Sequence, residues 1–60
     1  MVTWNENRYI GNGTYYREGT CMSTDTKPTD VANGSVLIEM DTGKIFFFDQ
    51  AGSTWREFGG

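Results

Sequence analysis

Two short apolar runs separated by a turn sequence form the clearest pattern in this chain. The first run, Ser-Val-Leu-Ile-Glu-Met, spans 35–40, and the second, Ile-Phe-Phe-Phe, spans 45–48. Asp-Thr-Gly-Lys lies between them, and an Asn-Gly dipeptide precedes the first run. β-Branched and aromatic runs of this length, bounded by Asn, Asp and Gly, are typical of strands joined in a hairpin. The pattern therefore predicts a β-hairpin over 35–48.

Two pairing registers are compatible with this hairpin. A three-residue loop with Gly43 in the left-handed region pairs Ile38 with Phe46, whereas a two-residue Thr-Gly turn pairs Ile38 with Phe47. Asp-Thr-Gly suits a type I turn that ends in a glycine bulge. We therefore expect the three-residue loop, with Asp41 and Gly43 defining the turn.

The three consecutive phenylalanines at 46–48 place large apolar side chains on both faces of the predicted sheet. Successive strand residues point to opposite faces, so at least one phenylalanine must point away from its two neighbours. A single sheet would then expose one apolar face to water unless something covers it. Two coverings remain open: the N-terminal segment of the chain, or a partner chain.

The flanking segments complete an all-β prediction. Thr-Trp-Arg-Glu-Phe at 54–58 follows another turn sequence, so 35–58 is expected to form a small antiparallel meander of three strands. Residues 23–34 are expected to form a polar loop. Residues 1–22 are expected to form an N-terminal arm or a short hairpin around Gly-Asn-Gly. Together these segments predict one small β domain over 1–60.

The small size of the chain points to a stabilising partner. A domain of 60 residues buries only about 60% of the surface that its unfolded chain exposes, so it is marginally stable alone. Cys21 is the only cysteine and histidine is absent, which excludes an intrachain disulfide and disfavours zinc. We expect no metal and no cofactor. Oligomerisation or docking onto a larger partner is the remaining source of stability.

Charge and hydropathy argue against nucleic acid and membrane partners. The net charge is −3, and the five basic residues are spread singly along the chain, whereas phosphate binding requires clustered positive charge. No apolar run approaches the roughly 20 residues that span a bilayer. Met1 does not begin a signal-peptide pattern. A free thiol without an export signal suits synthesis in a cytoplasm.

The acidic and thiol groups do not form a recognisable catalytic set. Asp41 and Asp49 both begin turns, where an aspartate side chain bonds nearby backbone amides. Glu39 lies mid-strand and is expected to pair with Lys44 or Arg56. The lone cysteine has no histidine to activate it, and burial as a small apolar residue is expected instead. The sequence therefore predicts a protein that is not an enzyme.

Aromatic residues are the remaining candidates for function, at 15% of the chain. Tryptophan and tyrosine dominate binding hot spots because they combine a large apolar area with a polar group. Trp55 lies on a predicted strand and is expected in the core. The candidate partner contacts are Trp4, Tyr9, Tyr15 and Tyr16. Consecutive strand residues cannot both point inward, so one of the adjacent tyrosines must be exposed.

The hairpin region also resembles a known class of protein. The stretch from Asn33 to Asp49, with its Gly-Ser strand, Asp-Thr-Gly-Lys turn and aromatic strand ending in Asp, followed by Trp55, is similar to small proteins and terminal modules encoded in the structural gene clusters of tailed bacteriophages and prophages of Gram-positive hosts. The preceding polar segment at 23–29 is also similar. The resemblance covers about 23–58, and residues 1–22 lie outside it.

This resemblance implies a virion component that is made in the cytoplasm of the host bacterium. The favoured role is a capsid decoration (cement) subunit that binds the major capsid protein, as a homo-oligomer or in many copies on the particle. The alternative is a receptor- or glycan-binding module of a tail tip or fibre, in which exposed aromatic side chains stack on the ligand. A small phage-encoded inhibitor of a host protein is a third reading.

Overall fold

The computed structural model describes residues 1–59, which contain five β-strands and no helix. The all-β prediction is therefore confirmed. The strands are β1 (Thr3–Gly11), β2 (Thr14–Cys21), β3 (Val36–Glu39), β4 (Ile45–Asp49) and β5 (Thr54–Glu57).

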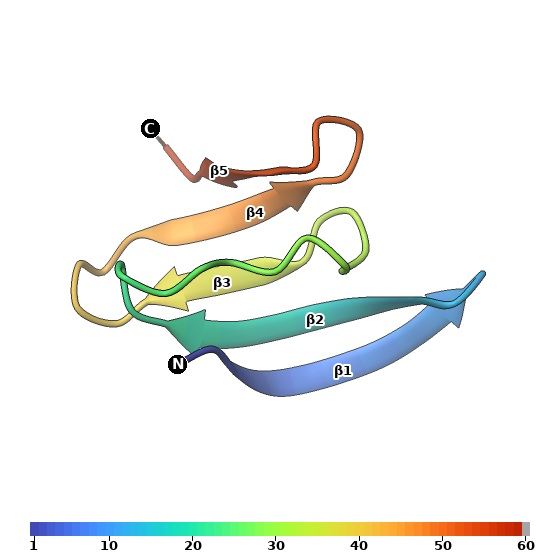
Figure 1. Cartoon of the computed structure of the whole chain (residues 1–60), viewed down its shortest axis with the longest axis horizontal. Coiled ribbons are helices and arrows are strands. Elements are labelled where there is room, and N and C mark those ends of the chain that lie inside the picture. The colour runs from blue at the N-terminus through green and yellow to red at the C-terminus, as the bar shows by residue number, and fades with distance from the viewer. Residues whose placement is uncertain (60) are drawn as a thin grey trace.

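The five strands form one mixed sheet in the order β1-β2-β3-β4-β5 (Figure 1). Neighbouring strands are antiparallel except β2 and β3, which are parallel. The N-terminal pair forms the hairpin expected around Gly-Asn-Gly, but it is long and not an arm: β1 has nine residues, β2 has eight, and β2 is hydrogen-bonded directly to β3. The two halves of the chain therefore share one sheet.

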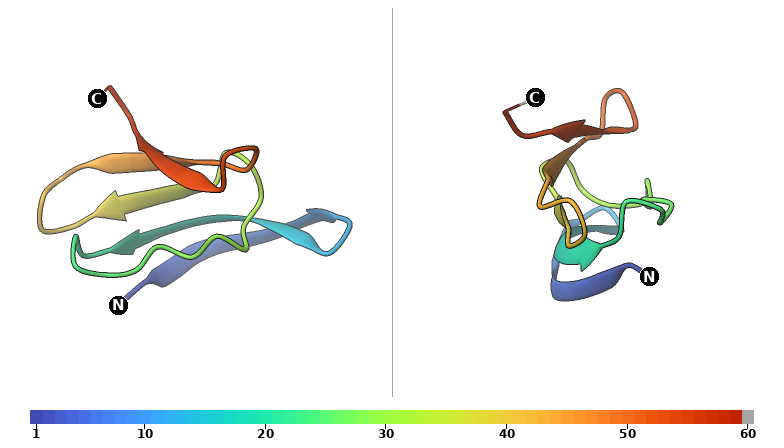
Figure 2. Two further views of the ribbon diagram at one scale, coloured as in Figure 1. Left: turned by 45° about the horizontal axis from the view of Figure 1, so that its top comes forward. Right: turned by 90° about the vertical axis from the view of Figure 1, so that its left-hand side faces the viewer.

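The parallel pairing determines the path of the segment 22–35. Two parallel neighbours need a crossover connection of a dozen or more residues, because the chain must return to the end of the sheet from which β2 started. Here the crossover has no strand or helix of its own and runs along one side of the sheet (Figures 1 and 2). We call the side under this crossover the covered face and the opposite side the open face.

The core lies between the crossover and the covered face. Its buried apolar side chains are Cys21, Val31, Ala32, Leu37 and Phe48, two of them from the crossover itself. Three backbone hydrogen bonds join the crossover to the sheet: from Ala32 N to Tyr15 O (2.8 Å), from Gly34 N to Phe48 O (2.9 Å) and from Phe48 N to Ser35 O (2.9 Å). These bonds satisfy polar groups that would otherwise be buried without partners.

Burial alternates along β3 and identifies the two faces. Ser35, Leu37 and Glu39 are buried, whereas Val36 is half-buried and Ile38 is exposed. Strand side chains alternate between faces, so the three buried residues point to the covered face and the other two point to the open face. The sequence pattern alone, with apolar residues at three consecutive positions, does not show which set is buried.

The register of the β3–β4 hairpin differs from both expected registers. The facing residues are Val36 and Phe47, Leu37 and Phe46, and Ile38 and Ile45. Ile38 therefore lies opposite Ile45, not opposite Phe46 or Phe47. The observed register puts Leu37 and Phe46 together on the side that the crossover covers. Tertiary packing of the crossover thus favours a pairing that local turn chemistry does not predict.

The turn that joins β3 to β4 is accordingly longer than expected, with four residues from Met40 to Gly43. Glu39 N donates to Lys44 O and Gly43 N donates to Glu39 O, both at 2.8 Å. Gly43 has a φ of +77°, in the left-handed region that side chains with a Cβ adopt only at a cost. A Cβ at this position would meet no atom within 4 Å, so that cost is purely conformational.

Replacing Gly43 tests this turn. Gly43→Val is expected to lower the free energy of unfolding by about 1–3 kcal/mol, because a β-branched residue resists positive φ. Gly43→Asn is the matched control and should lose clearly less, since asparagine tolerates the left-handed region. Urea unfolding followed by tryptophan fluorescence measures both. Equal stability of the two variants would contradict the left-handed turn.

Candidate interaction surfaces

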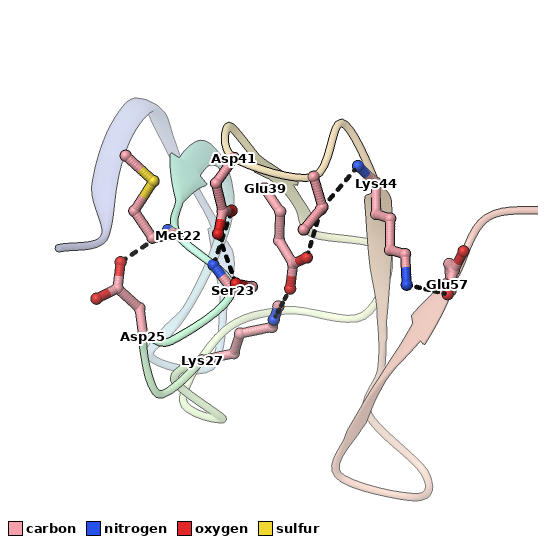
Figure 3. A network of polar contacts seen from close by, with 9 residues as sticks. Met22, Ser23, Asp25, Lys27, Glu39, Asp41, Lys44 and Glu57 are labelled. Carbon is pink, nitrogen blue, oxygen red and sulfur yellow. Dashed lines mark hydrogen bonds and ion pairs between the residues drawn. The ribbon is translucent and has the colours of Figure 1, made fainter.

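A polar network ties the crossover to the turn between β3 and β4 (Figure 3). Glu39 accepts hydrogen bonds from Lys27 Nζ and from Thr42 Oγ1, each at 2.7 Å. The side chains of Lys27 and Glu39 are only 16% and 6% exposed, and the lysine ammonium also lies 4.4 Å from the centre of the Phe46 ring. A buried charge requires a partner of this kind.

The expected partners of Glu39 were wrong. Lys44 pairs instead with Glu57, at 3.9 Å, and Arg56 donates to Asp49 at 2.9 Å. Arg56 faces Phe47 on the open face and so lies away from Glu39. Lys44 lies opposite Glu39 but pairs with Glu57, and the crossover supplies the lysine that binds Glu39 from a distant part of the sequence.

Two further aspartates hold the same end of the crossover. Asp41 accepts from Ser23 N at 2.9 Å and from Ser23 Oγ at 2.5 Å. Asp25 accepts from Met22 N at 2.8 Å and from the amino group of Met1 at 2.6 Å. Asp41 therefore does more than shape its own turn, because it also binds the start of the crossover.

These bonds lower the pKa values of the three carboxyls. The bonds from Lys27 and Thr42 lower the pKa of Glu39, and the bond from the Ser23 hydroxyl lowers the pKa of Asp41. The amino terminus has the same effect on the pKa of Asp25. The carboxylates are thus stabilised in their charged form by the contacts that anchor the crossover.

Three of the four predicted contact aromatics lie together on β1 and β2. The Arg17 guanidinium lies 5.7 Å from the ring centre of Trp4 and 5.6 Å from that of Tyr15. The rings of Tyr9 and Tyr15 meet edge to face at 5.1 Å. Arg17 is itself held by a 3.0 Å bond to Asn7 Oδ1. We call Trp4, Tyr9, Tyr15 and Arg17 the aromatic strip.

The strip follows the long hairpin of β1 and β2, whose turn projects past the ends of the other strands (Figure 1). Tyr9 is 57% exposed and Tyr15 38% exposed. Trp4 is half-buried and packs over Gly19: a Cβ added to that glycine would overlap Thr3 O and lie 2.7 Å from the tryptophan ring. Sequence reasoning missed Arg17, although its two-residue spacing from Tyr15 places the two on one face.

Tyr16 lies on the opposite face from the strip. Its ring lies 5.5 Å from the Arg8 guanidinium, and its hydroxyl donates to Glu18 at 2.6 Å, which raises the pKa of the phenol. Trp55 contacts Phe48, with 5.1 Å between ring centres, and its Nε1 donates to Pro28 O at 2.8 Å. It therefore packs between the sheet and the crossover.

The open face carries the second candidate surface, an apolar patch formed by Val36, Ile38, Ile45, Phe47 and Phe58. The exposed fraction is 37% for each isoleucine, 39% for Phe47 and 66% for Phe58. Phe58 lies against Phe47, with 5.6 Å between the ring centres. The N-terminal segment does not cover this patch, because it forms β1 and β2 of the same sheet. We call these five residues the open patch.

Within residues 1–59 there is no pocket and no group of three or more His, Cys, Asp or Glu side chains placed to hold a metal. Nor does this range hold a helix long and apolar enough to cross a membrane. Cys21 is buried and unpaired, and burial raises the pKa of its thiol.

No family model matches the chain, and no curated protein or solved structure matches it either. The aromatic strip and the open patch, together with the resemblance in the hairpin region, therefore carry the functional argument.

The network around Glu39 predicts a pH-dependent stability. Because its folded pKa is depressed, Glu39 stabilises the fold above its ordinary pKa of 4.5, and that stabilisation is lost as the pH falls through the lower folded value. Glu39→Gln should have a lower urea midpoint at pH 7 and a weaker dependence of stability on pH below about 4.5. Urea titrations at a series of pH values measure both effects.

Glu57→Gln is the control for this prediction. Glu57 is 40% exposed, and its ion pair with Lys44 is long, at 3.9 Å. Because exposed pairs of this kind contribute little, the loss of the Glu57 charge should change stability by less than about 0.5 kcal/mol. An equal effect of the two substitutions would contradict the structural role of the Lys27–Glu39 pair.

Proposed function

We propose that this chain is a non-enzymatic structural protein of a tailed-phage virion, and most specifically a capsid decoration subunit bound in many copies to the major capsid protein. The open patch is the observation that carries the assembly role. A small domain that leaves five apolar side chains on one sheet face gains stability when another protein surface removes them from water. The phage origin and the capsid partner come from the sequence resemblance.

The aromatic strip supplies the contact with the capsid in this proposal. It follows the hairpin of β1 and β2, whose turn extends past the rest of the sheet (Figure 1), and its members Tyr9 and Tyr15 face each other near that turn. Tyrosine and tryptophan beside an arginine are the side chains that most often dominate binding energy. In this proposal Tyr16, which lies on the opposite face from the strip, contacts the partner protein on the open side of the sheet.

The clustering of the strip also favours a second candidate, a glycan- or receptor-binding module of a tail tip or fibre. Tyr9 and Tyr15 offer exposed rings for stacking on a sugar, and the Arg17 guanidinium beside them offers hydrogen-bond donors. Titration of the protein with cell-wall polysaccharide from the host, followed by amide chemical shifts, distinguishes this role. Saturable shifts confined to the strip would favour glycan binding over capsid binding.

Purified particles test the decoration role. The phage or prophage whose genome encodes this chain is propagated, the particles are banded by density, and the copies of the chain per particle are measured by quantitative mass spectrometry. We expect many copies in heads that lack tails as well as in whole particles. Absence of the chain from banded particles, or its presence in tails alone, would contradict the proposal.

Substitutions in the strip connect that result to the structure. Tyr9→Ala should reduce the copies per particle at least about tenfold, because it removes an exposed aromatic contact. Ile10→Ala is the matched control, since Ile10 is 59% exposed and is next to Tyr9 in β1 but is not part of the strip. Equal retention of both variants would exclude the strip as the contact surface.

A further inference from the structure

The five residues of the open patch belong to two rows of facing residues, which cross the sheet from β2 to β5 and also include polar end residues. The first row is formed by facing residues of the four strands: Glu18, Val36, Phe47 and Arg56. It begins with an acid and ends with a base, and its two middle positions are apolar. The ends of the row are three strand spacings apart, about 14 Å, too far for Glu18 and Arg56 of one chain to pair.

We infer that the open patch binds a second copy of this chain, related by a two-fold axis that runs parallel to the strands between β3 and β4. The inference rests on the assembly role proposed above and names the partner of the open patch. This axis reverses the order of each row. Glu18 then faces Arg56 of the second copy, and Val36 faces Phe47 of the second copy, so both apolar and charged positions are complementary.

The second row obeys the same symmetry. It runs through Thr20, Ile38 and Ile45 to Phe58, whose amide donates to Ile45 O at 2.7 Å. Reversal puts Ile38 over Ile45 of the second copy, and puts Phe58 over Thr20 of the second copy. Phe58, the most exposed member of the patch, therefore becomes buried at the edge of the interface.

The charges select this axis over the other face-to-face arrangement. An axis that runs along the first row, across the strands, would place each residue of that row over its own copy. Glu18 would then face Glu18 and Arg56 would face Arg56, and juxtaposed like charges are unfavourable. Only the axis parallel to the strands is consistent with the charges at both ends of the row.

Both charged groups keep free bonding capacity for the second copy. Arg56 uses its Nε in the bond to Asp49, which leaves the other guanidinium N–H groups available, and its side chain is 68% exposed. Glu18 accepts the Tyr16 hydroxyl through Oε2, which leaves its other carboxylate oxygen available.

The size of the face suits a dimer that dissociates on dilution. The stacked strands β3, β4 and β5 have four to five residues each, so the face formed with β2 measures about 20 by 17 Å, and two such faces bury on the order of 700 Å², the size of a weak, transient interface. Two sheets stacked about 10 Å apart form a β-sandwich with one apolar core. The aromatic strips then point outward on opposite sides, free to contact a capsid.

Sedimentation equilibrium of the full chain over a series of concentrations tests the dimer. The wild-type protein should change from monomer to dimer as its concentration increases, and no higher species is expected. Phe47→Glu should weaken dimerisation at least about thirtyfold, because it buries a charge in the centre of the interface. Tyr9→Glu, on the other face, is the matched control and should dimerise like the wild type.

The pairing of the charged ends has its own test. Glu18→Arg alone and Arg56→Glu alone should each weaken dimerisation, because each places like charges together. An equimolar mixture of these two variants should form a heterodimer with an affinity near that of the wild type, because both opposite-charge pairs are restored. Failure of the mixture to restore association would overturn the proposed axis.

Amide chemical shifts of the wild-type protein, followed on dilution, keep the test independent of any variant that fails to fold. Shifts confined to β2–β5 and Phe58 support the inference, whereas a monomer at every concentration overturns it. A monomer that is still incorporated into particles through the open patch would assign that patch to the capsid protein instead. A dimer that is absent from particles would keep this inference and reject the virion role.

Discussion

The parallel pairing of β2 with β3 is the constraint on which the rest of this structure depends. It joins the N-terminal hairpin to the C-terminal strands in one sheet, and it requires a connection that returns along that sheet. The segment 22–35 makes this return over one face (Figure 2), and the buried side chains of β2, β3 and β4 lie on that face.

The crossover succeeds as a cover because charged and apolar contacts act together. Val31 and Ala32 supply apolar burial above Leu37, while the Lys27–Glu39 pair holds the other end against the β3–β4 turn (Figure 3). A segment without secondary structure has few internal hydrogen bonds, so its order depends on such contacts with the sheet. Glu39 and Asp41 both anchor this segment, whereas Asp49 bonds Arg56 instead.

Covering one face leaves the other open, and this division gives the molecule two distinct surfaces. The open patch is apolar, with Glu18 at one border and Arg56 at the other. The aromatic strip lies on the long hairpin of β1 and β2, and its side chains point to the covered face. The two sets of residues do not overlap. The same molecule can therefore bind a second copy through the open patch and a larger partner through the aromatic strip.

The sequence by itself determined the all-β class, the presence of a turn around Asp41 and Gly43, the exposure of aromatic side chains, and the presence of apolar residues on both faces. These follow from local rules, because strand propensity, turn chemistry and two-residue alternation act between near neighbours in the chain. Even the open patch is implicit in three consecutive phenylalanines, which cannot all point to one core.

The tertiary structure alone decided the register of β3 with β4, the partner of Glu39, and the grouping of Trp4 and Tyr15 around Arg17. Each depends on segments far apart in the sequence: Lys27 reaches Glu39 only because the crossover returns over β3. Local turn rules favoured a different register because they contain no information about which face the crossover buries. Where alternative pairings are close in energy, the side chains that can be buried together determine the choice.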